Sequence, residues 1–111
     1  MNYSVFSAGN DRWWFRLREN DGTILLVGDI HSCRQDVIHA IERTRECSQH
    51  ERLFKKLDLG KENFGFLLDA ADGIFLARSM SFRTAAIRQS VIMHIRDHAL
   101  RAPLHPLASQ T

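Results

Sequence analysis

Residues 13–48 read WWFRLRENDGTILLVGDIHSCRQDVIHAIERTRECS, and residues 64–99 read FGFLLDAADGIFLARSMSFRTAAIRQSVIMHIRDHA. The two stretches align without a gap at an offset of 51 residues. The matching pairs include Phe15 and Phe66, Leu17 and Leu68, Asp21-Gly22 and Asp72-Gly73, Leu25 and Leu76, Ile41 and Ile92, and Arg45 and Arg96. A fixed offset is typical of one supersecondary unit that is used twice.

The first stretch predicts a β-hairpin followed by a helix. Residues 12–18 alternate with period two, and residues 23–28 are rich in Ile, Leu and Val, as expected of paired strands. Asp21 and Gly22 lie between them and supply the positive φ that a tight hairpin turn requires. A helix is predicted over about residues 32–47, because apolar residues recur there at helical spacing.

A further strand is predicted over residues 2–7, and residues 51–59 hold the matching place before the second stretch. We therefore expect an α+β fold of two tandem βββα repeats, with antiparallel sheets each covered by one helix and a pseudo-twofold relation between the halves. The predicted boundaries are 1–48 and 52–99 for the two repeats, 1–99 for the single domain that they form, and 100–111 for a C-terminal tail.

Length and composition are those of one small globular domain. The chain has 111 residues, 44% hydrophobic and 25% charged, and a formal net charge of +2, which is too small to indicate nucleic-acid binding by itself. No run of apolar residues is long enough to span a membrane, and the N-terminus does not resemble a secretory signal. Cys33 and Cys47 lie too far apart on the predicted helix to form a disulfide. We expect a cytoplasmic protein without a membrane partner.

The repeated pattern resembles the YegP-like family of small bacterial proteins, which have no assigned function. The matching positions are Trp13-x-Phe15-x-Leu17, Gly22, Ile24-Leu25, Ser32 and Ile41 in the first unit, and Phe64-x-Phe66-x-Leu68, Gly73, Phe75-Leu76 and Ile92 in the second. The resemblance covers about residues 2–98 and implies a two-repeat α+β fold in a bacterial cytoplasmic protein. It implies no reaction.

One strand face distinguishes the first unit from the second. Arg12, Trp14, Arg16 and Arg18 share a face by strand alternation, whereas the second unit has Asn63, Gly65, Leu67 and Asp69 at these positions. Trp and Arg are enriched at protein interfaces, and a row of guanidiniums beside a ring also suits a single-stranded nucleic acid. A third possibility is that the Arg stems simply cover Trp14.

The same outer face is predicted to carry apolar residues that no helix of the chain covers. These candidate interface residues are Leu25, Val27, Leu67, Ile74 and Leu76. Large exposed apolar patches are rare on monomers, and a twofold contact is the commonest way to bury one. We therefore expect a homodimer that places the arginine row at its rim, where Asp69 of the other half or of the other chain could meet it. Burial of the face within one chain is the alternative.

The sequence favours a non-enzymatic protein-interaction module over a nucleic-acid-binding module, and either over an enzyme. His94 and His98 stand four residues apart on the second predicted helix, but no set of four ligands has the spacing of a metal site. No nucleophile–base pair or phosphate-binding loop is recognisable, so we expect no catalytic residues, cofactor or metal. Arg88 interrupts an apolar helix stripe, and we expect it to reach out to solvent rather than to pair with a carboxylate on the sheet.

Overall fold

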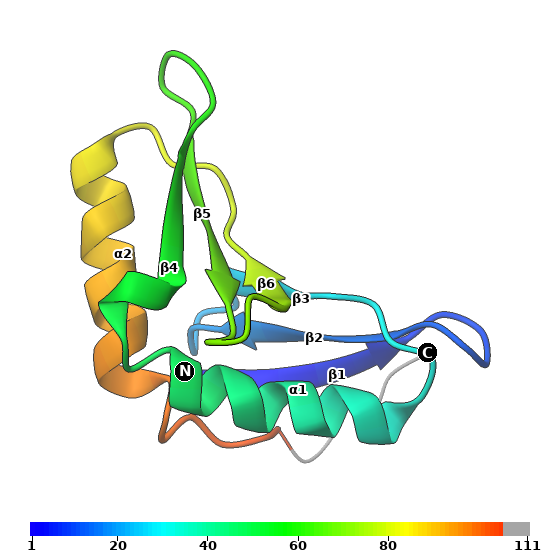
Figure 1. Cartoon of the computed structure of the whole chain (residues 1–111). Coiled ribbons are helices and arrows are strands. Elements are labelled where there is room, and N and C mark those ends of the chain that lie inside the picture. Colours follow the sequence, from blue (N-terminus) through cyan, green and yellow to red (C-terminus); the bar gives the residue numbers. More distant parts are fainter. Residues whose placement is uncertain (106–111) are drawn as a thin grey trace.

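The structure, a computed structural model, describes residues 1–105 of the chain. Each run of three strands is followed by a long helix (Figure 1). The elements are β1 (Asn2–Ser7), β2 (Trp13–Arg18), β3 (Ile24–Gly28), α1 (Arg34–Cys47), the short 3-10 turn η1 (Glu51–Leu53), β4 (Phe54–Asp58), β5 (Phe64–Asp69), β6 (Phe75–Arg78) and α2 (Ala85–His98).

The six strands form one antiparallel sheet in the order β1-β2-β3-β6-β5-β4. The α+β class is therefore as predicted, but the two separate three-stranded sheets are in fact one. They join where Val27 of β3 lies opposite Arg78 of β6, and Gly28 opposite Ala77. Without this pairing both β3 and β6 would be open edges with unpaired backbone groups.

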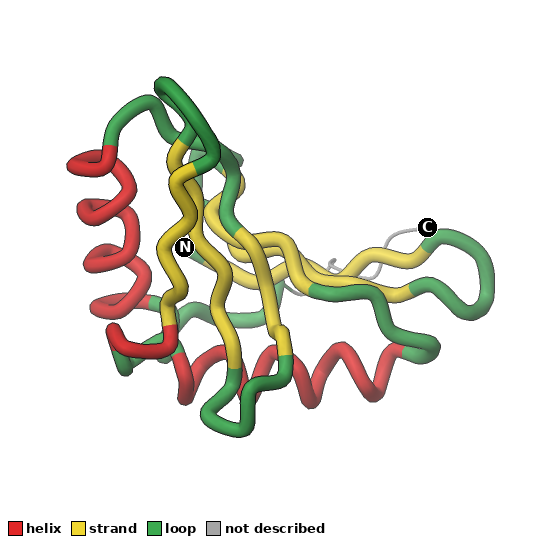
Figure 2. The backbone as a smooth tube through the Cα atoms, turned by 45° about the horizontal axis from the view of Figure 1, so that its top comes forward, coloured by secondary structure: helices red, strands yellow, loops and turns green. Residues whose placement is uncertain are grey.

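The sheet bends strongly between its two halves, and both helices lie on the outside of the bend. Figures 1 and 2 show α1 along the half formed by β1–β3 and α2 along the half formed by β4–β6. The opposite face of the sheet lies on the inside of the bend. Neither helix covers it, and we call it the concave face.

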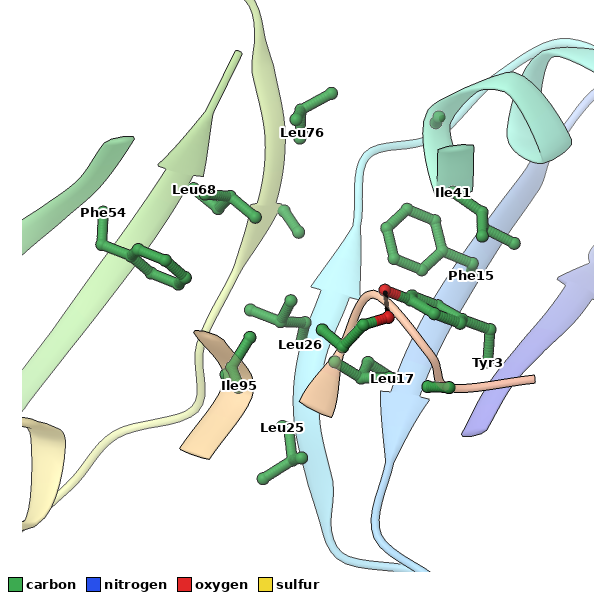
Figure 3. Close-up of a cluster of buried hydrophobic side chains, with 14 of the residues drawn as sticks. Tyr3, Phe15, Leu17, Leu25, Leu26, Ile41, Phe54, Leu68, Leu76 and Ile95 are labelled. Atoms are coloured by element: carbon green, nitrogen blue, oxygen red, sulfur yellow. Dashed lines mark hydrogen bonds between the residues drawn. The ribbon is translucent and has the colours of Figure 1, made fainter. Parts of the chain in front are cut away.

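The core lies between the sheet and the two helices (Figure 3). The apolar periodicity of the predicted strands and helices indicates twelve core residues, and seven of them are buried, namely Phe15, Leu17, Ile41, Phe66, Leu68, Ile92 and Ile95. Five others that were expected there, Trp13, Ile24, Ile38, Phe64 and Phe75, are only half-buried. Leu26 and Val37 are fully buried as well.

A register shift occurs at the same place in each hairpin. In the first, Leu17 pairs with Leu26 and Arg18 with Ile24, which leaves Leu25 as the extra residue of a bulge. In the second, Leu68 pairs with Ala77 and Asp69 with Phe75, which leaves Leu76. A bulge interrupts the alternation of side chains between the two faces, so residues near it cannot be assigned to a face by counting.

Each helix contacts the hairpin of the other half. Arg43 of α1 forms an ion pair with Asp72 in the β5–β6 turn, with its Nη2 atom 2.8 Å from Oδ2. His94 of α2 lies 2.8 Å from Glu19, which follows β2. These contacts connect the halves on the helix side, while the β3–β6 pairing connects them within the sheet. The two halves are therefore in contact both through the sheet and through the helices.

Arg88 does not reach out to solvent, so that expectation is wrong. Its side chain is only 9% exposed, and it donates to Asp58 at 2.6 Å and to the backbone carbonyl of Leu57 at 3.0 Å. The guanidinium also lies over the ring of Phe64. A buried charge is tolerated when it is paired and hydrogen-bonded, and the end of β4 provides both partners.

Part of the predicted tail lies along the edge of the sheet. Tyr3 of β1 donates its N–H to Pro103 and accepts from the N–H of His105, and Ala102 is buried. Residues 106–111, which include the rest of the predicted tail, lie outside the described residues. Among residues 1–105, no helix has both the length and the apolar character needed to cross a membrane.

Candidate binding face of the sheet

A continuous row of side chains crosses the concave face from one edge of the sheet to the other. Each member lies directly opposite the next in the strand pairing. In order from β1 to β4, the row is Ser4, Arg16, Val27, Arg78, Leu67 and Lys55. Cations and apolar residues therefore alternate across the middle of this face, and the row contains no carboxylate.

A basic hollow of about 450 Å³ lies on the first half of the concave face. Three arginines line it: Arg12 just before β2, Arg16 in β2 and Arg78 in β6. The remaining lining residues are Ala8, Trp14, Val27, Gly28, Asp29, Ile30 and Phe75. Of its four charged lining residues, Arg12, Arg16 and Asp29 come from the first half and Arg78 comes from the second.

None of the three arginines of the basic hollow forms an ion pair with another residue among 1–105. The guanidinium of Arg16 lies 4.7 Å from the centroid of the Phe6 ring, and its Nε is buried without a hydrogen-bond partner in the described part of the chain. The carboxylate of Asp29, which accepts from the N–H of Ile30, is the only acidic group among the lining residues. The hollow therefore has an excess of positive charge.

Trp14 contributes a half-buried indole to the same hollow. It stacks on Phe6 of β1, with ring centroids 6.0 Å apart and planes inclined by 20°. The guanidiniums of Arg16 and Arg18 lie over the ring of Phe6 rather than over Trp14. Phe6 instead provides the platform on which the ring and the cations are arranged.

Arg18 lies outside the basic hollow. It donates to the hydroxyl of Ser4 at 3.0 Å, and it lines a different hollow near the β2–β3 turn. The expected rim contact with Asp69 is wrong within the chain, because Asp69 is buried and its carboxylate lies 2.8 Å from Lys55. Lys55 already neutralises this group.

An apolar hollow of about 290 Å³ occupies the second half of the concave face. Its lining residues are Leu57, Leu59, Asn63, Gly65, Phe66, Leu67, Arg78, Ser79, Met80 and Ser81. Leu59 and Met80 are exposed by 61% and 43%. The offset of 51 residues maps Arg12, Trp14 and Arg16 onto Asn63, Gly65 and Leu67 of this hollow. The two hollows thus occupy matching places but differ in chemistry, and Arg78 borders both.

Three of the predicted interface residues are not on the concave face. Leu25 and Leu76 are buried in the core, with 5% and 3% exposure, because the two bulges break the alternation on which their placement depended. Ile74 is exposed but lines a hollow beside α1, together with His39 and Arg43. Val27 and Leu67 are half-buried and lie in the row across the concave face.

Sequence reasoning missed Arg78. It is the one charged residue of β6, and the equivalent position in the first half is Val27. It joins Arg12 and Arg16 only because β3 and β6 pair at the centre of the sheet. The signal that could have found it is an arginine that breaks a run of apolar strand residues.

The histidine pair on α2 is not part of this face. The rings of His94 and His98 lie 4.8 Å apart, and His94 contacts Glu19 at 2.8 Å. No group of three or more potential metal ligands occurs among residues 1–105. The pair therefore connects α2 to the first hairpin.

Two solved structures have the same arrangement of strands and helices. The solution structure of UPF0339 protein SO3888 from Shewanella oneidensis matches with a TM-score of 0.83 and 19% sequence identity, over 93% of this chain and 88% of that chain. The solution structure of YegP from Escherichia coli, a protein of unknown function, matches with a TM-score of 0.84 and 17% identity, over 99% and 91%. The chain has the YegP-like fold.

A curated relative extends the YegP-like resemblance to sequence. It is the UPF0339 protein in the ptx operon 5′ region of Stutzerimonas stutzeri, which is 20% identical over 97 residues, 87% of each protein. No family model matches the chain. The resemblance to the YegP-like proteins is nevertheless confirmed by the relative and the two structures together. Neither the relative nor the two proteins of known structure has a stated activity. A function therefore has to be argued from the concave face itself.

Proposed function

We propose that this YegP-like chain is a small non-enzymatic protein-interaction module that uses the concave face of its sheet. The observation that carries this proposal is the composition of that face, where unpaired guanidiniums lie beside exposed apolar side chains in a region that no helix covers. Arginine, tryptophan and methionine are enriched at protein interfaces. The composition of this concave face therefore favours its burial against a protein partner over its exposure to solvent.

The simplest partner is a second copy of the chain, and the apolar hollow is the proposed contact. Leu59 and Met80 are largely exposed there, and Leu57 and Leu67 are half-buried beside them. A twofold contact would remove these side chains from water on both copies at once. It would leave the basic hollow, which lies on the other half of the face, outside the contact.

Sedimentation equilibrium at several concentrations tests the proposed homodimer. We expect a concentration-dependent dimer, and we expect Leu67→Glu to give a folded monomer because it places a carboxylate in the apolar contact. Ile87→Glu is the matched control, since Ile87 is an exposed apolar residue on α2, away from this face. A strictly monomeric wild-type chain at high micromolar concentration would exclude the homodimer.

The two-repeat architecture is part of the same proposal. We propose that residues 1–48 and 52–99 are tandem βββα repeats related by a pseudo-twofold axis between β3 and β6. The support comes from features that recur at the offset, such as the bulges after Leu17 and Leu68 and the bridges of Trp13 with His31 and Phe64 with Phe82. Superposing residues 13–48 on 64–99 tests it, and different chain paths would contradict it.

We also propose that the protein acts in the bacterial cytoplasm. Cys33 and Cys47 are both free, and Cys33 is exposed, as expected where thiols stay reduced. Fractionation of the native host tests this location. Recovery of the protein outside the cytoplasm would contradict it.

A nucleic-acid-binding module is the second candidate function. Arg12 and Arg16 lack ion-pair partners among the described residues and lie beside Trp14, which is how cationic grooves with aromatic platforms hold single strands. A labelled oligonucleotide should then bind with an affinity that falls steeply with salt. Absence of any salt-dependent binding would remove this candidate and leave the protein-interaction module.

A further inference from the structure

The proposed homodimer contact does not explain the charge or the shape of the basic hollow. Three guanidiniums and one carboxylate line it, so two positive charges are in excess. A phosphate monoester carries about −1.5 to −2 charges near neutral pH, and this matches the excess. A single carboxylate or a phosphodiester would neutralise only about one of these charges.

The walls of the hollow beside these cations are apolar and partly aromatic. Trp14, Ile30 and Phe75 line it together with Val27, and the indole is held in place by its stacking on Phe6. Indole faces and guanidinium planes both stack on flat rings. A volume of about 450 Å³ lies within the range of about 300–1,000 Å³ that small-ligand sites occupy.

We propose that the basic hollow binds a small phosphate monoester attached to a planar ring, as in a nucleoside monophosphate. Arg12, Arg16 and Arg78 bind the phosphate, and Trp14 holds the ring. Because Arg78 comes from the second half, the site requires the β3–β6 pairing that joins the two halves. This site lies beside the apolar hollow that the proposed homodimer uses, and Arg78 borders both hollows.

Isothermal titration calorimetry of the full chain tests the site with adenosine 5′-monophosphate as the probe. We expect binding that weakens at least about tenfold when the phosphate is removed, as in adenosine, because charge-assisted contacts are lost. Glucose 6-phosphate and inorganic phosphate should also bind about tenfold more weakly, since neither has a ring that stacks on an indole. Equal binding of adenosine 5′-monophosphate, glucose 6-phosphate and inorganic phosphate would show an adventitious ion only and overturn the proposal.

Variants separate the site from general attraction to a basic surface. Arg78→Ala and Trp14→Ala should each weaken binding by about tenfold. Arg101→Ala is the control, because Arg101 is exposed and lies outside the hollow. Thermal unfolding of each variant confirms that it is folded. An Arg101→Ala effect as large as that of Arg78→Ala would overturn the assignment.

A competition experiment separates the free nucleotide from a nucleic acid. A single-stranded oligonucleotide that displaces the monophosphate at equal or lower phosphate concentration would make a strand the ligand and overturn the small-molecule proposal. No heat of binding at millimolar monophosphate would also overturn it. Neither result bears on the homodimer, which sedimentation decides, so the two proposals fail separately.

Discussion

Tyr3 is the residue at which the core, the C-terminal segment and the ionic groups of α1 meet. Its ring is fully buried, its hydroxyl donates to the carbonyl of Ala99 at 3.0 Å, and the guanidinium of Arg45 lies 5.0 Å from the ring centroid. Burial raises the pKa of the Tyr3 hydroxyl well above its usual value, and the nearby cation only partly opposes this. The phenol therefore stays protonated in the folded protein at a pH where it ionises in the unfolded chain.

This pKa shift predicts a loss of stability in alkali. Above pH 10 the unfolded chain releases the Tyr3 proton and the folded protein keeps it, so the free energy of unfolding should fall by about 1.4 kcal/mol per pH unit. Tyr3→Phe should remove this part of the pH dependence, at a cost of about 1 kcal/mol at pH 7 for the lost hydrogen bond. Urea unfolding of both proteins between pH 9 and pH 11 measures it. Parallel curves for the two proteins would contradict the prediction.

At the scale of the elements, β3 is shaped by its contact with the strand beside it. Gly28 ends β3, and a Cβ atom at this position would lie 2.3 Å from Cε1 of Phe15. The Phe15 ring is fully buried and so cannot easily move away. The Phe15 ring of β2 can therefore pack over β3 at Gly28 only because this position has no side chain.

Gly28→Ala is expected to destabilise the protein by about 1–3 kcal/mol, as overpacked core substitutions do. Gly65→Ala is the control in the other half, because its Cβ would meet Ser79 Oγ at 3.3 Å rather than a buried ring. We expect Gly65→Ala to change the free energy of unfolding by less than about 1 kcal/mol. Chemical denaturation of both variants gives the comparison, and equal losses would mean that the Phe15 contact is not the cause.

At the scale of the whole molecule, we expect the two halves to unfold as one cooperative unit. They share a sheet through β3 and β6, and each helix contacts the opposite hairpin, through Arg43 with Asp72 and through His94 with Glu19. A domain held together both within the sheet and outside it is expected to unfold in a single transition. The concave face, with its two different hollows, exists only while both halves are folded.

Phe66→Ala tests this cooperativity. Phe66 belongs to β5 in the second half and is 1% exposed, so its truncation should cost about 3–5 kcal/mol. Both tryptophans, Trp13 and Trp14, lie in the first half. Tryptophan fluorescence and circular dichroism should therefore report the same lowered midpoint. A fluorescence transition that stays at the wild-type midpoint would show that the halves unfold independently.

The sequence by itself determined the features that depend on neighbours in the chain. Period-two alternation predicted β2 and β5, the Asp-Gly pairs predicted both hairpin turns, and Gly22 and Gly73 have the positive φ values, 93° and 88°, that such turns require. Helical spacing predicted α1 and α2, and the arginines and Trp14 of the first half were found from strand alternation alone. These features are local because they follow from backbone geometry over a few residues.

Only the tertiary structure decided the features that depend on residues far apart in the chain. Whether β3 pairs with β6 depends on how two hairpins meet, and this pairing brings Arg78 to the basic hollow. The bulges moved Leu25 and Leu76 into the core, because one extra residue reverses every later side chain without changing the composition of the strand. Arg88 pairs with the carboxylate of Asp58, which lies thirty residues away in the sequence. No local pattern records such a partner, since the free energy of a buried ion pair depends on where both groups lie in the folded chain.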